Sequence, residues 1–273
     1  FPTRRSSDLL YRFPIVKTFK GNNFYHNGFE VDKIFPNATI RVASWWQIVK
    51  VSYYVPNYIL NRIVRRFLPQ RKYEYIQPPL DAYLYDNSAL MAKEASYFEG
   101  YWFSPLFYDF CKKKIWEEFK FRPFKSKVNL HLLEMLKKDN SVTVHIRRGD
   151  FLNIDYFKDI CTLDYYYKAI TEAKKFLSKP MFFIFSNDLE WCKINLKDVL
   201  NGDEVIFVAN NVGKESYRDM QLMSLARCNI LANSSFSWWG AYLNQRNNHI
   251  VFAPKIWVNM PCDDVFCEEW IKI

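Results

Sequence analysis

From residue 142 onward the chain alternates short apolar runs with amphipathic segments, and this alternation limits the possible folds more than any other feature. Short apolar runs rich in β-branched or aromatic residues indicate buried strands, and apolar residues at helical spacing indicate helices between them. This order predicts an α/β fold, in which a parallel sheet carries helices on both faces. The predicted strands are 142–146, 181–185, 205–208, 229–232 and 250–253, and the predicted helices are 164–177, 188–196, 215–226 and 236–244.

Length, glycine content and charge narrow the classes of protein and of partner that fit this chain. The 273 residues suffice for one large or two modest domains. Only 7 glycines are present, and neither G-x-G-x-x-G nor G-x-x-x-x-G-K-[ST] occurs, which disfavours a dinucleotide oxidoreductase and a P-loop kinase. A formal net charge of +9 favours a negatively charged partner, such as a nucleotide, a nucleic acid or an anionic membrane. Charge alone does not separate these partners from an ordinary solvated basic surface.

The chain changes character near residue 140, so we expect two domains, 1–140 and 141–273. The first part has weak periodicity and several prolines. Its segment 62–72 is basic and amphipathic. It either contacts a negatively charged partner, such as a membrane surface or an anionic acceptor, or it forms an ordinary solvated helix. The aromatic cluster 99–104 either stacks on a sugar through Tyr101 and Trp102 or packs in the core.

The cysteines and the termini bear on the location of the protein. The six cysteines form no C-x-x-C motif, so we expect no structural zinc site and reduced thiols in a cytoplasmic protein. No apolar run is long enough for a membrane span. The stretch 1–9 (FPTRRSSDL) is polar and without pattern, and we expect it to be non-native.

The sharpest motif is H-I-R-R-G-D at 145–150, which follows the first predicted strand of the second part. Arginine guanidinium groups suit phosphate oxygens, and the adjacent glycine permits close approach. Strand alternation separates the two arginines, so Arg147 shares the side of His145 and is our choice for the phosphate. Arg148 is then a structural partner, for example of Asp150. The alternative is a surface loop without ligand.

Two further motifs follow later strands. In N-S-S-F-S-W-W at 233–239, Ser235 and Ser237 begin a helix whose N-terminus is an anion site, unless the serines only cap the helix. In F-S-N-D at 185–188, Asn187 or Asp188 would accept hydrogen bonds from a base or ribose, unless they only start a helix. Parallel strands end at one edge of the sheet, so all three motifs predict one nucleotide-diphosphate site. No D-x-D occurs, and we expect no metal: arginine and the helix dipole neutralise the leaving diphosphate.

Four segments resemble family 11 glycosyltransferases, the α-1,2-fucosyltransferases: VTVHIRRGDF (142–151), FFIFSNDLEWCK (182–193), DMQLMSLARCNILANSSFSWWGAYLN (219–244) and EGYWFSP (99–105). In the last of these, Phe103 stands where glutamine is commoner in the family. The resemblance implies a GT-B-like fold of two Rossmann-like domains. It implies inverting, metal-independent transfer of fucose from GDP-fucose, without a cofactor, to a galactose-terminated oligosaccharide or lipid-linked glycan.

The resemblance also assigns residues. Arg147 is the catalytic residue, and the donor site comprises His145, Arg147, Asn187, Asp188, Asp219, Ser235, Phe236 and Ser237. Tyr101 and Trp102 lie on the acceptor side. The catalytic base is left open, with Asp150 a candidate by position.

One departure from the family and several alternatives remain. The family opens with a strand and a G-G-L-G-N-Q-M-F-Q-Y segment, which this chain lacks, so we expect the first strand of the first domain to be missing. The alternatives are another GDP-fucose transferase with a different acceptor, and a non-catalytic sugar-nucleotide or glycan-binding relative. Nucleic-acid binding rests on charge alone, and no recognition motif supports it. We expect a cytoplasmic protein with peripheral contact at the inner membrane surface.

Overall fold

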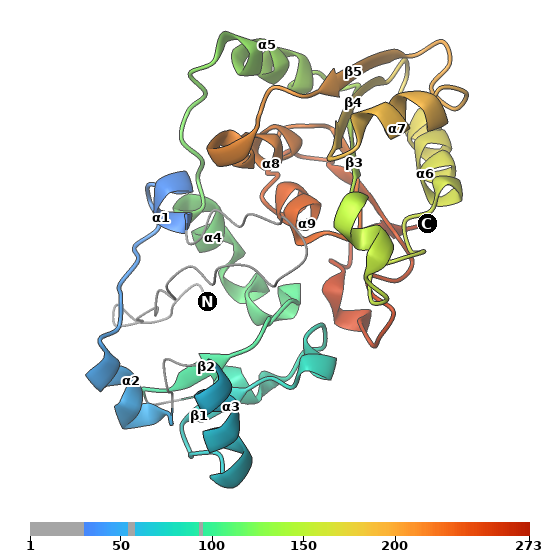
Figure 1. Cartoon of the computed structure of the whole chain (residues 1–273). Helices are drawn as coiled ribbons and strands as arrows, with labels where there is room; N and C mark the ends of the chain where they lie inside the picture. Colours follow the sequence, from blue (N-terminus) through green and yellow to red (C-terminus); the bar gives the residue numbers. More distant parts are fainter. Residues whose placement is uncertain (1–29, 54–57, 93–94) are drawn as a thin grey trace. The chain divides into compact units, whose positions relative to one another are not determined.

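The structure, a computed structural model, describes residues 30–53, 58–92 and 95–273 (Figure 1). The chain forms two compact units. Unit 1 comprises Phe1–Lys33, Asn37–Glu118 and Pro261–Val265, and unit 2 comprises Ile34–Pro36, Phe119–Met260 and Phe266–Ile273. Units defined by contacts need not coincide with domains read from sequence, so the division after residue 140 stays a prediction. The expectation for residues 1–9 concerns residues outside the described part.

Unit 2 is built on a six-stranded sheet in which every neighbouring pair is parallel, as the alternating pattern predicts. The strand order is β5-β4-β3-β6-β7-β8. The chain therefore builds outward from β3 in one direction and then returns to the other side of β3 at β6. The strands are β3 (Ser141–Ile146), β4 (Met181–Ser186), β5 (Glu204–Val208), β6 (Cys228–Ile230), β7 (Ile250–Ala253) and β8 (Ile271–Lys272).

Helices cover both faces of this sheet because its central strands are apolar on both sides. On one face Val144 and Ile184 pack against α6 and α7, and on the other Phe183 and Phe185 pack against α5 and α8. In Figure 1, α6 and α7 lie to the right of β3, and α5, α8 and α9 lie to its left. The helices are α5 (Lys127–Leu136), α6 (Leu163–Phe176), α7 (Leu189–Asn195), α8 (Tyr217–Met223) and α9 (Ser235–Tyr242).

The five predicted strands and four predicted helices of the second part are all present; the strand at 250–253 has the predicted bounds, and the other elements have shifted ends. The Thr162 side chain caps α6 as predicted, accepting a hydrogen bond from the backbone N–H of Tyr165 at 3.4 Å. The helix predicted at 215–226 is shorter, because Gly213–Glu215 forms a separate 3₁₀ turn and α8 ends at Met223. Sequence analysis identified neither α5 nor β8.

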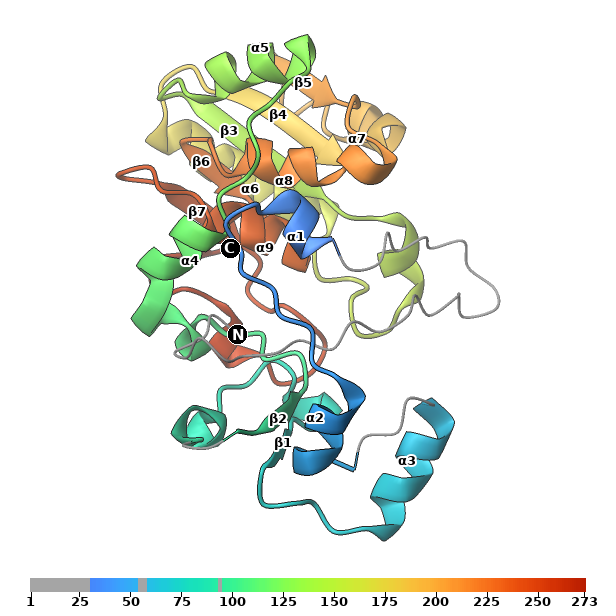
Figure 2. The same ribbon diagram turned by 90° about the vertical axis from the view of Figure 1, so that its left-hand side faces the viewer.

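The sheet of unit 1 is a parallel pair of three-residue strands, β1 (Glu74–Ile76) and β2 (Tyr97–Glu99). Its buried carboxylate, Glu74, accepts hydrogen bonds from Ser52 Oγ at 2.7 Å and from the backbone N–H groups of Tyr53 and Arg71 at 2.9 Å each. This carboxylate ties the start of β1 to the segment that follows α2. The helices are α2 (Trp45–Val51), α3 (Tyr58–Phe67) and α4 (Lys112–Glu118), and a one-turn helix, α1 (Val31–Ile34), precedes them (Figure 2).

Candidate active site

The topology of unit 2 makes the carboxyl ends of β3 and β6 the candidate ligand site. These strands are neighbours, but the chain leaves β3 toward β4 and leaves β6 toward β7. In open α/β sheets such a switch in direction opens a crevice outside the carboxyl ends of the strands, where ligands bind. The segments that follow β3, β4 and β6 carry the three predicted motifs, so all three lie at this edge.

His145 sits near the carboxyl end of β3, with 6% of its surface exposed. Its ring lies 5.7 Å from the ring of Phe236 in α9. Burial lowers the pKa of His145 to about 3, and the positive charge of Arg147 acts in the same direction. The imidazole is therefore neutral at pH 7. Its Nδ1 is buried and has no hydrogen-bond partner within the described part of the chain. An unsatisfied buried nitrogen at a ligand edge is a position where a bound molecule would supply the missing partner.

The two arginines after β3 have different surroundings, as strand alternation predicts. Arg148 is held in place: its Nε lies 3.3 Å from Asp188 Oδ2, and its guanidinium stacks 3.9 Å from the centroid of the Trp191 ring. Its carboxylate partner is thus Asp188; the side chain of Asp150, the example expected from sequence, lies outside the described part. Arg147 is half-buried, with its guanidinium 5.5 Å from the centroid of Phe151. Arg147 is therefore the arginine of this motif whose charge acts on His145.

Asn187 and Asp188 hold the loop after β3 in shape. Asn187 Oδ1 accepts the backbone N–H of Arg148 at 2.9 Å. Asp188 uses both carboxylate oxygens, one for Arg148 and one to cap α7 through the N–H of Trp191 at 3.1 Å. Gly149 has φ +51°, and a Cβ atom there would lie 2.6 Å from Asn187 Nδ2, so a side chain at this position would strain the backbone and displace Asn187. These contacts orient the arginines, and direct donor contacts from Asn187 and Asp188 stay predictions.

The N-terminus of α9 faces the same edge, and its serines have separate roles. Ser234, the residue before the helix, accepts the N–H of Phe236 at 3.3 Å. Ser235 is exposed and available to a ligand. Ser237 is fully buried, and its Oγ lies 3.1 Å from the carbonyl oxygen of Ala232, so its hydroxyl stabilises the turn. The predicted donor contact of Ser237 is not supported by this geometry and stays a prediction, whereas the helix dipole still favours an anion here.

Asn233 is a site residue that sequence analysis did not single out. It is 3% exposed, and its Nδ2 donates to the carbonyl oxygens of Phe157 at 3.2 Å and Trp257 at 3.3 Å. Its backbone N–H approaches Cys161 Sγ at 3.3 Å. Asn233 thereby joins the loops after β3 and β7 to the end of β6. The sequence does contain a sign of this role: an asparagine stands at the end of an apolar strand, where its side-chain amide needs buried hydrogen-bond partners.

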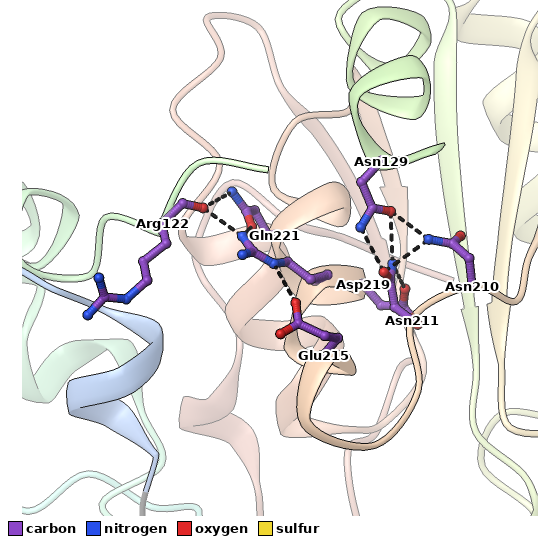
Figure 3. A network of polar contacts seen from close by, with 8 residues as sticks. Arg122, Asn129, Asn210, Asn211, Glu215, Asp219 and Gln221 are labelled. Carbon is purple, nitrogen blue, oxygen red and sulfur yellow. Dashed lines mark hydrogen bonds and ion pairs between the residues drawn. The ribbon is translucent and has the colours of Figure 1, made fainter. Parts of the chain in front are cut away.

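Asp219 lies in α8 beside asparagines that follow β5, as Figure 3 shows. Asn211 Nδ2 donates to Asp219 Oδ1 at 2.7 Å, and Asn129 Nδ2 of α5 donates to Asn211 Oδ1 at 2.8 Å. Asn210 Nδ2 donates to Asn129 Oδ1 at 2.7 Å. Burial raises the pKa of Asp219 to about 7, against the opposing effect of the hydrogen bond from Asn211. Asp219 is therefore a carboxyl group that holds a proton readily at neutral pH, oriented by a cluster of amides.

The predicted acceptor-side residues belong to unit 1. Gln77 Oε1 accepts the backbone N–H groups of Tyr101 at 3.0 Å and Trp102 at 2.9 Å. A Cβ atom on Gly100 would lie 2.5 Å from Gln77 Cβ, which explains the glycine of this segment. Trp102 packs edge-on against Phe107, whereas Tyr101 is 77% exposed. Tyr101 is the ring of this pair available for stacking on a sugar, and Trp102 contributes to packing.

Nowhere in residues 30–53, 58–92 and 95–273 do three or more His, Cys, Asp or Glu side chains gather closely enough to hold a metal ion. None of the helices in that part has the length and apolar character needed to cross a bilayer. The six cysteines all lie in the described part and are free thiols.

Comparison with known proteins places this geometry in context. The model of glycosyl transferase family 11 matches residues 57–273. An alpha-1,2-colitosyltransferase of Escherichia coli is 32% identical over 272 residues, covering 92% of this chain and 85% of that protein. The O-antigen biosynthesis glycosyltransferase WbnK of Escherichia coli is 35% identical over 47% of this chain and 43% of its own length. The galactoside alpha-(1,2)-fucosyltransferase 2 of Mus musculus is 28% identical over 54% of this chain and 44% of its own length.

Proposed function

We propose, on the premise that this chain belongs to glycosyl transferase family 11, that it transfers L-fucose from GDP-β-L-fucose to the 2-hydroxyl group of a galactose-like residue. The family implies a nucleotide-sugar donor and a galactoside acceptor. The observation that carries the proposal is the buried, unpartnered Nδ1 of His145 close to Arg147, at the edge where β3 and β6 end.

The proposed reaction needs stabilisation of a leaving diphosphate. The bond between the anomeric carbon and the β-phosphate oxygen breaks, and its electron pair stays on GDP. The acceptor oxygen bonds to the anomeric carbon from the opposite face, which inverts the configuration, and its proton passes to a base. Arg147 and the N-terminus of α9, with Ser235 and Phe236, would stabilise the negative charge that develops on the leaving diphosphate. Fixed charges and dipoles have this role in other enzymes. The identity of the base is left open.

The remaining predicted donor contacts fit a nucleotide that extends along the carboxyl edge of the sheet. We assign the nucleoside end to the region of Asn187, Asp188 and Asp219. Asp219 can accept N–H donors such as those of guanine, because only one of its oxygens receives the bond from Asn211. We also propose a GT-B arrangement, in which Tyr101 and Trp102 of unit 1 contribute to the acceptor side.

The sugar itself is open between two candidates. A relative that covers 92% of this chain is named a colitosyltransferase, and other relatives are named fucosyltransferases. Colitose is L-fucose without the 3-hydroxyl group. A site that hydrogen-bonds a substrate hydroxyl rejects the analogue lacking it by about 10⁴-fold or more, whereas a site that does not contact it discriminates weakly. Turnover of GDP-fucose and GDP-colitose with one galactoside acceptor therefore separates the two candidates.

The first test is calorimetric titration of the purified chain with GDP in the presence of EDTA, alongside Arg147→Ala. We expect binding by the wild type and a loss of about tenfold or more in the variant, the scale of a lost charge-assisted contact. Arg41→Ala removes one exposed positive charge from unit 1 and is the matched control, expected to bind as the wild type does. Equal binding by Arg147→Ala would contradict the proposed site.

The second test identifies the product. A galactose-terminated oligosaccharide incubated with each donor should yield a product whose α-1,2 linkage is assigned by NMR. Transfer to a different hydroxyl or sugar would favour another GDP-fucose transferase. GDP binding without transfer to any galactoside would favour a non-catalytic sugar-nucleotide-binding relative. We place the protein in the cytoplasm, in peripheral contact with the membrane surface, where a lipid-linked glycan is within reach.

A further inference from the structure

Helix α3 of unit 1 exposes an apolar stripe. Leu60, Ile63 and Phe67 are spaced as residues of one helical face, the spacing with which a helix normally faces a core. Instead, Ile63 is 48% exposed and Phe67 is 78% exposed, and Leu68, directly after the helix, is 44% exposed. Exposed apolar residues gathered on one element, unlike scattered single ones, mark a contact surface.

The same segment is strongly basic. Residues 62–72 contain five arginines and lysines (Arg62, Arg65, Arg66, Arg71 and Lys72) and no acidic residue. Arg66 and Lys72 are exposed. A helix with an apolar stripe and basic residues on its polar side is typical of elements that lie in the plane of an anionic membrane surface.

Charge also argues against a second copy of this chain as the occupant. A two-fold contact through α3 would bring the same basic segment of both copies together, and like charges across an interface cost binding energy. An anionic bilayer instead offers phosphates to the arginines and an apolar boundary to the stripe. Helix α2 of the same unit exposes Trp46 at 70%, and tryptophan is enriched at membrane–water interfaces.

We infer that α3 is a membrane-docking element, whose residues Ile63, Phe67 and Leu68 enter the headgroup region of an anionic lipid surface. With 10 residues, α3 is too short to span a bilayer and lies along the surface. Helix α3 is then the surface through which the proposed peripheral membrane contact is made. Only the link to a lipid-linked acceptor rests on the proposed function. Lipid binding by α3 is independent of GDP binding in unit 2.

The test is co-sedimentation of the full chain with vesicles. Vesicles of phosphatidylglycerol and phosphatidylethanolamine should retain the wild type, and vesicles of phosphatidylcholine alone should retain much less. Ile63→Ser and Phe67→Ser should each weaken binding about tenfold, the scale of a lost apolar side chain. Arg66→Gln should weaken it less and reduce its salt dependence.

Ile194→Ser is the matched control, because Ile194 is 74% exposed but lies in unit 2 on α7, far in sequence from the basic segment. It should bind vesicles as the wild type does. Circular dichroism and GDP titration of each variant show whether the fold and the donor site are intact. Absence of vesicle binding by a wild type that binds GDP, or equal binding by Ile63→Ser and Phe67→Ser, would overturn the inference. Sedimentation equilibrium showing a dimer that these two substitutions dissolve would also overturn it, in favour of a second copy.

Discussion

Different kinds of contact stabilise units 1 and 2. The central strands of unit 2 are buried on both faces, and their alternate residues pack into two separate apolar clusters. Unit 1 has two three-residue strands, and polar side chains that bond to backbone, such as Glu74 and Gln77, act there beside packed aromatic rings such as Trp102 and Phe107. The candidate donor-site residues therefore stand on a framework set by apolar packing in a regular sheet, whereas the EGYWFS segment is held by hydrogen bonds to Gln77 together with ring contacts of Trp102. Single substitutions should affect the two units in different ways.

The largest effect should follow a cavity in the sheet of unit 2. Phe183 is fully buried in β4 and packs in the cluster that includes Leu132 and Leu222. Phe183→Ala should cost about 3–5 kcal/mol of unfolding free energy, and GDP affinity should fall only as far as the cavity displaces the end of β4 or depletes the folded state. Urea unfolding and GDP calorimetry measure both. Phe176→Ala, at a ring that is 55% exposed, is the control and should change either quantity little.

The next effect should follow loss of the buried carboxylate of unit 1. Glu74→Ala leaves the Ser52 hydroxyl and the N–H groups of Tyr53 and Arg71 without their acceptor, which should cost about 2–4 kcal/mol. Limited proteolysis should cut unit 1 faster, while GDP affinity stays within about twofold of wild type because the donor residues belong to unit 2. Glu99→Ala, at an exposed carboxylate, is the control. A loss of GDP binding in Glu74→Ala would contradict the expectation that the donor site depends on unit 2 alone.

The same contrast explains how much the sequence could predict. The strands of unit 2 were predictable because burial on both faces leaves continuous apolar runs, such as 181–185, that stand out from their surroundings. The positions of Arg147 and His145 followed from their place at a strand end and from strand alternation. In unit 1 such periodicity is absent, because strands of three residues are too short to show it.

Other features could not be predicted because they depend on contacts between distant segments. The alternation predicts parallel strands but not the order that places β6 beside β3. The partner of Arg148 is Asp188, 40 residues away, and a local sequence pattern favoured Asp150 instead. Asn129 and Asn211 are 82 residues apart and meet only in the folded chain. β8 has two residues, too few for any pattern.

A smaller effect should follow a change in the loop after β3. Gly149→Ala introduces a Cβ atom 2.6 Å from Asn187 Nδ2 at a position with φ +51°. The loop must shift, which should cost about 1–2 kcal/mol and weaken GDP binding about tenfold. Gly202→Ala is matched, because Gly202 has φ +84° but no heavy atom within 4 Å of the added Cβ. Equal GDP affinities in the two variants would show that the loop after β3 accommodates the added Cβ atom without loss of GDP binding.

A pH-dependent effect of similar size should come from Asp219, the carboxyl group of unit 2 to compare with Glu74. Glu74 accepts hydrogen bonds from Ser52, Tyr53 and Arg71, whereas the hydrogen bond that Asp219 accepts from Asn211 does not offset its burial. The pKa of Asp219 is therefore raised from 3.8 to about 7. A raised pKa means that the folded state binds the proton more tightly than the unfolded state. The stability that this provides is complete below pH 3.8 and is lost as the pH rises through about 7.

Asp219→Asn removes this titration and keeps an acceptor for Asn211. Between pH 5 and pH 8 the wild type should lose about 1–2 kcal/mol of unfolding free energy relative to the variant, less than the full shift because the side chain is only half-buried. Urea midpoints of both proteins at the two pH values measure the difference. If the difference in unfolding free energy between the two proteins is the same at both pH values, Asp219 is already ionised at pH 5. The amide cluster would then stabilise a carboxylate, as the donors around Glu74 do. Unit 2 would then share at this point the polar mode of stabilisation seen in unit 1.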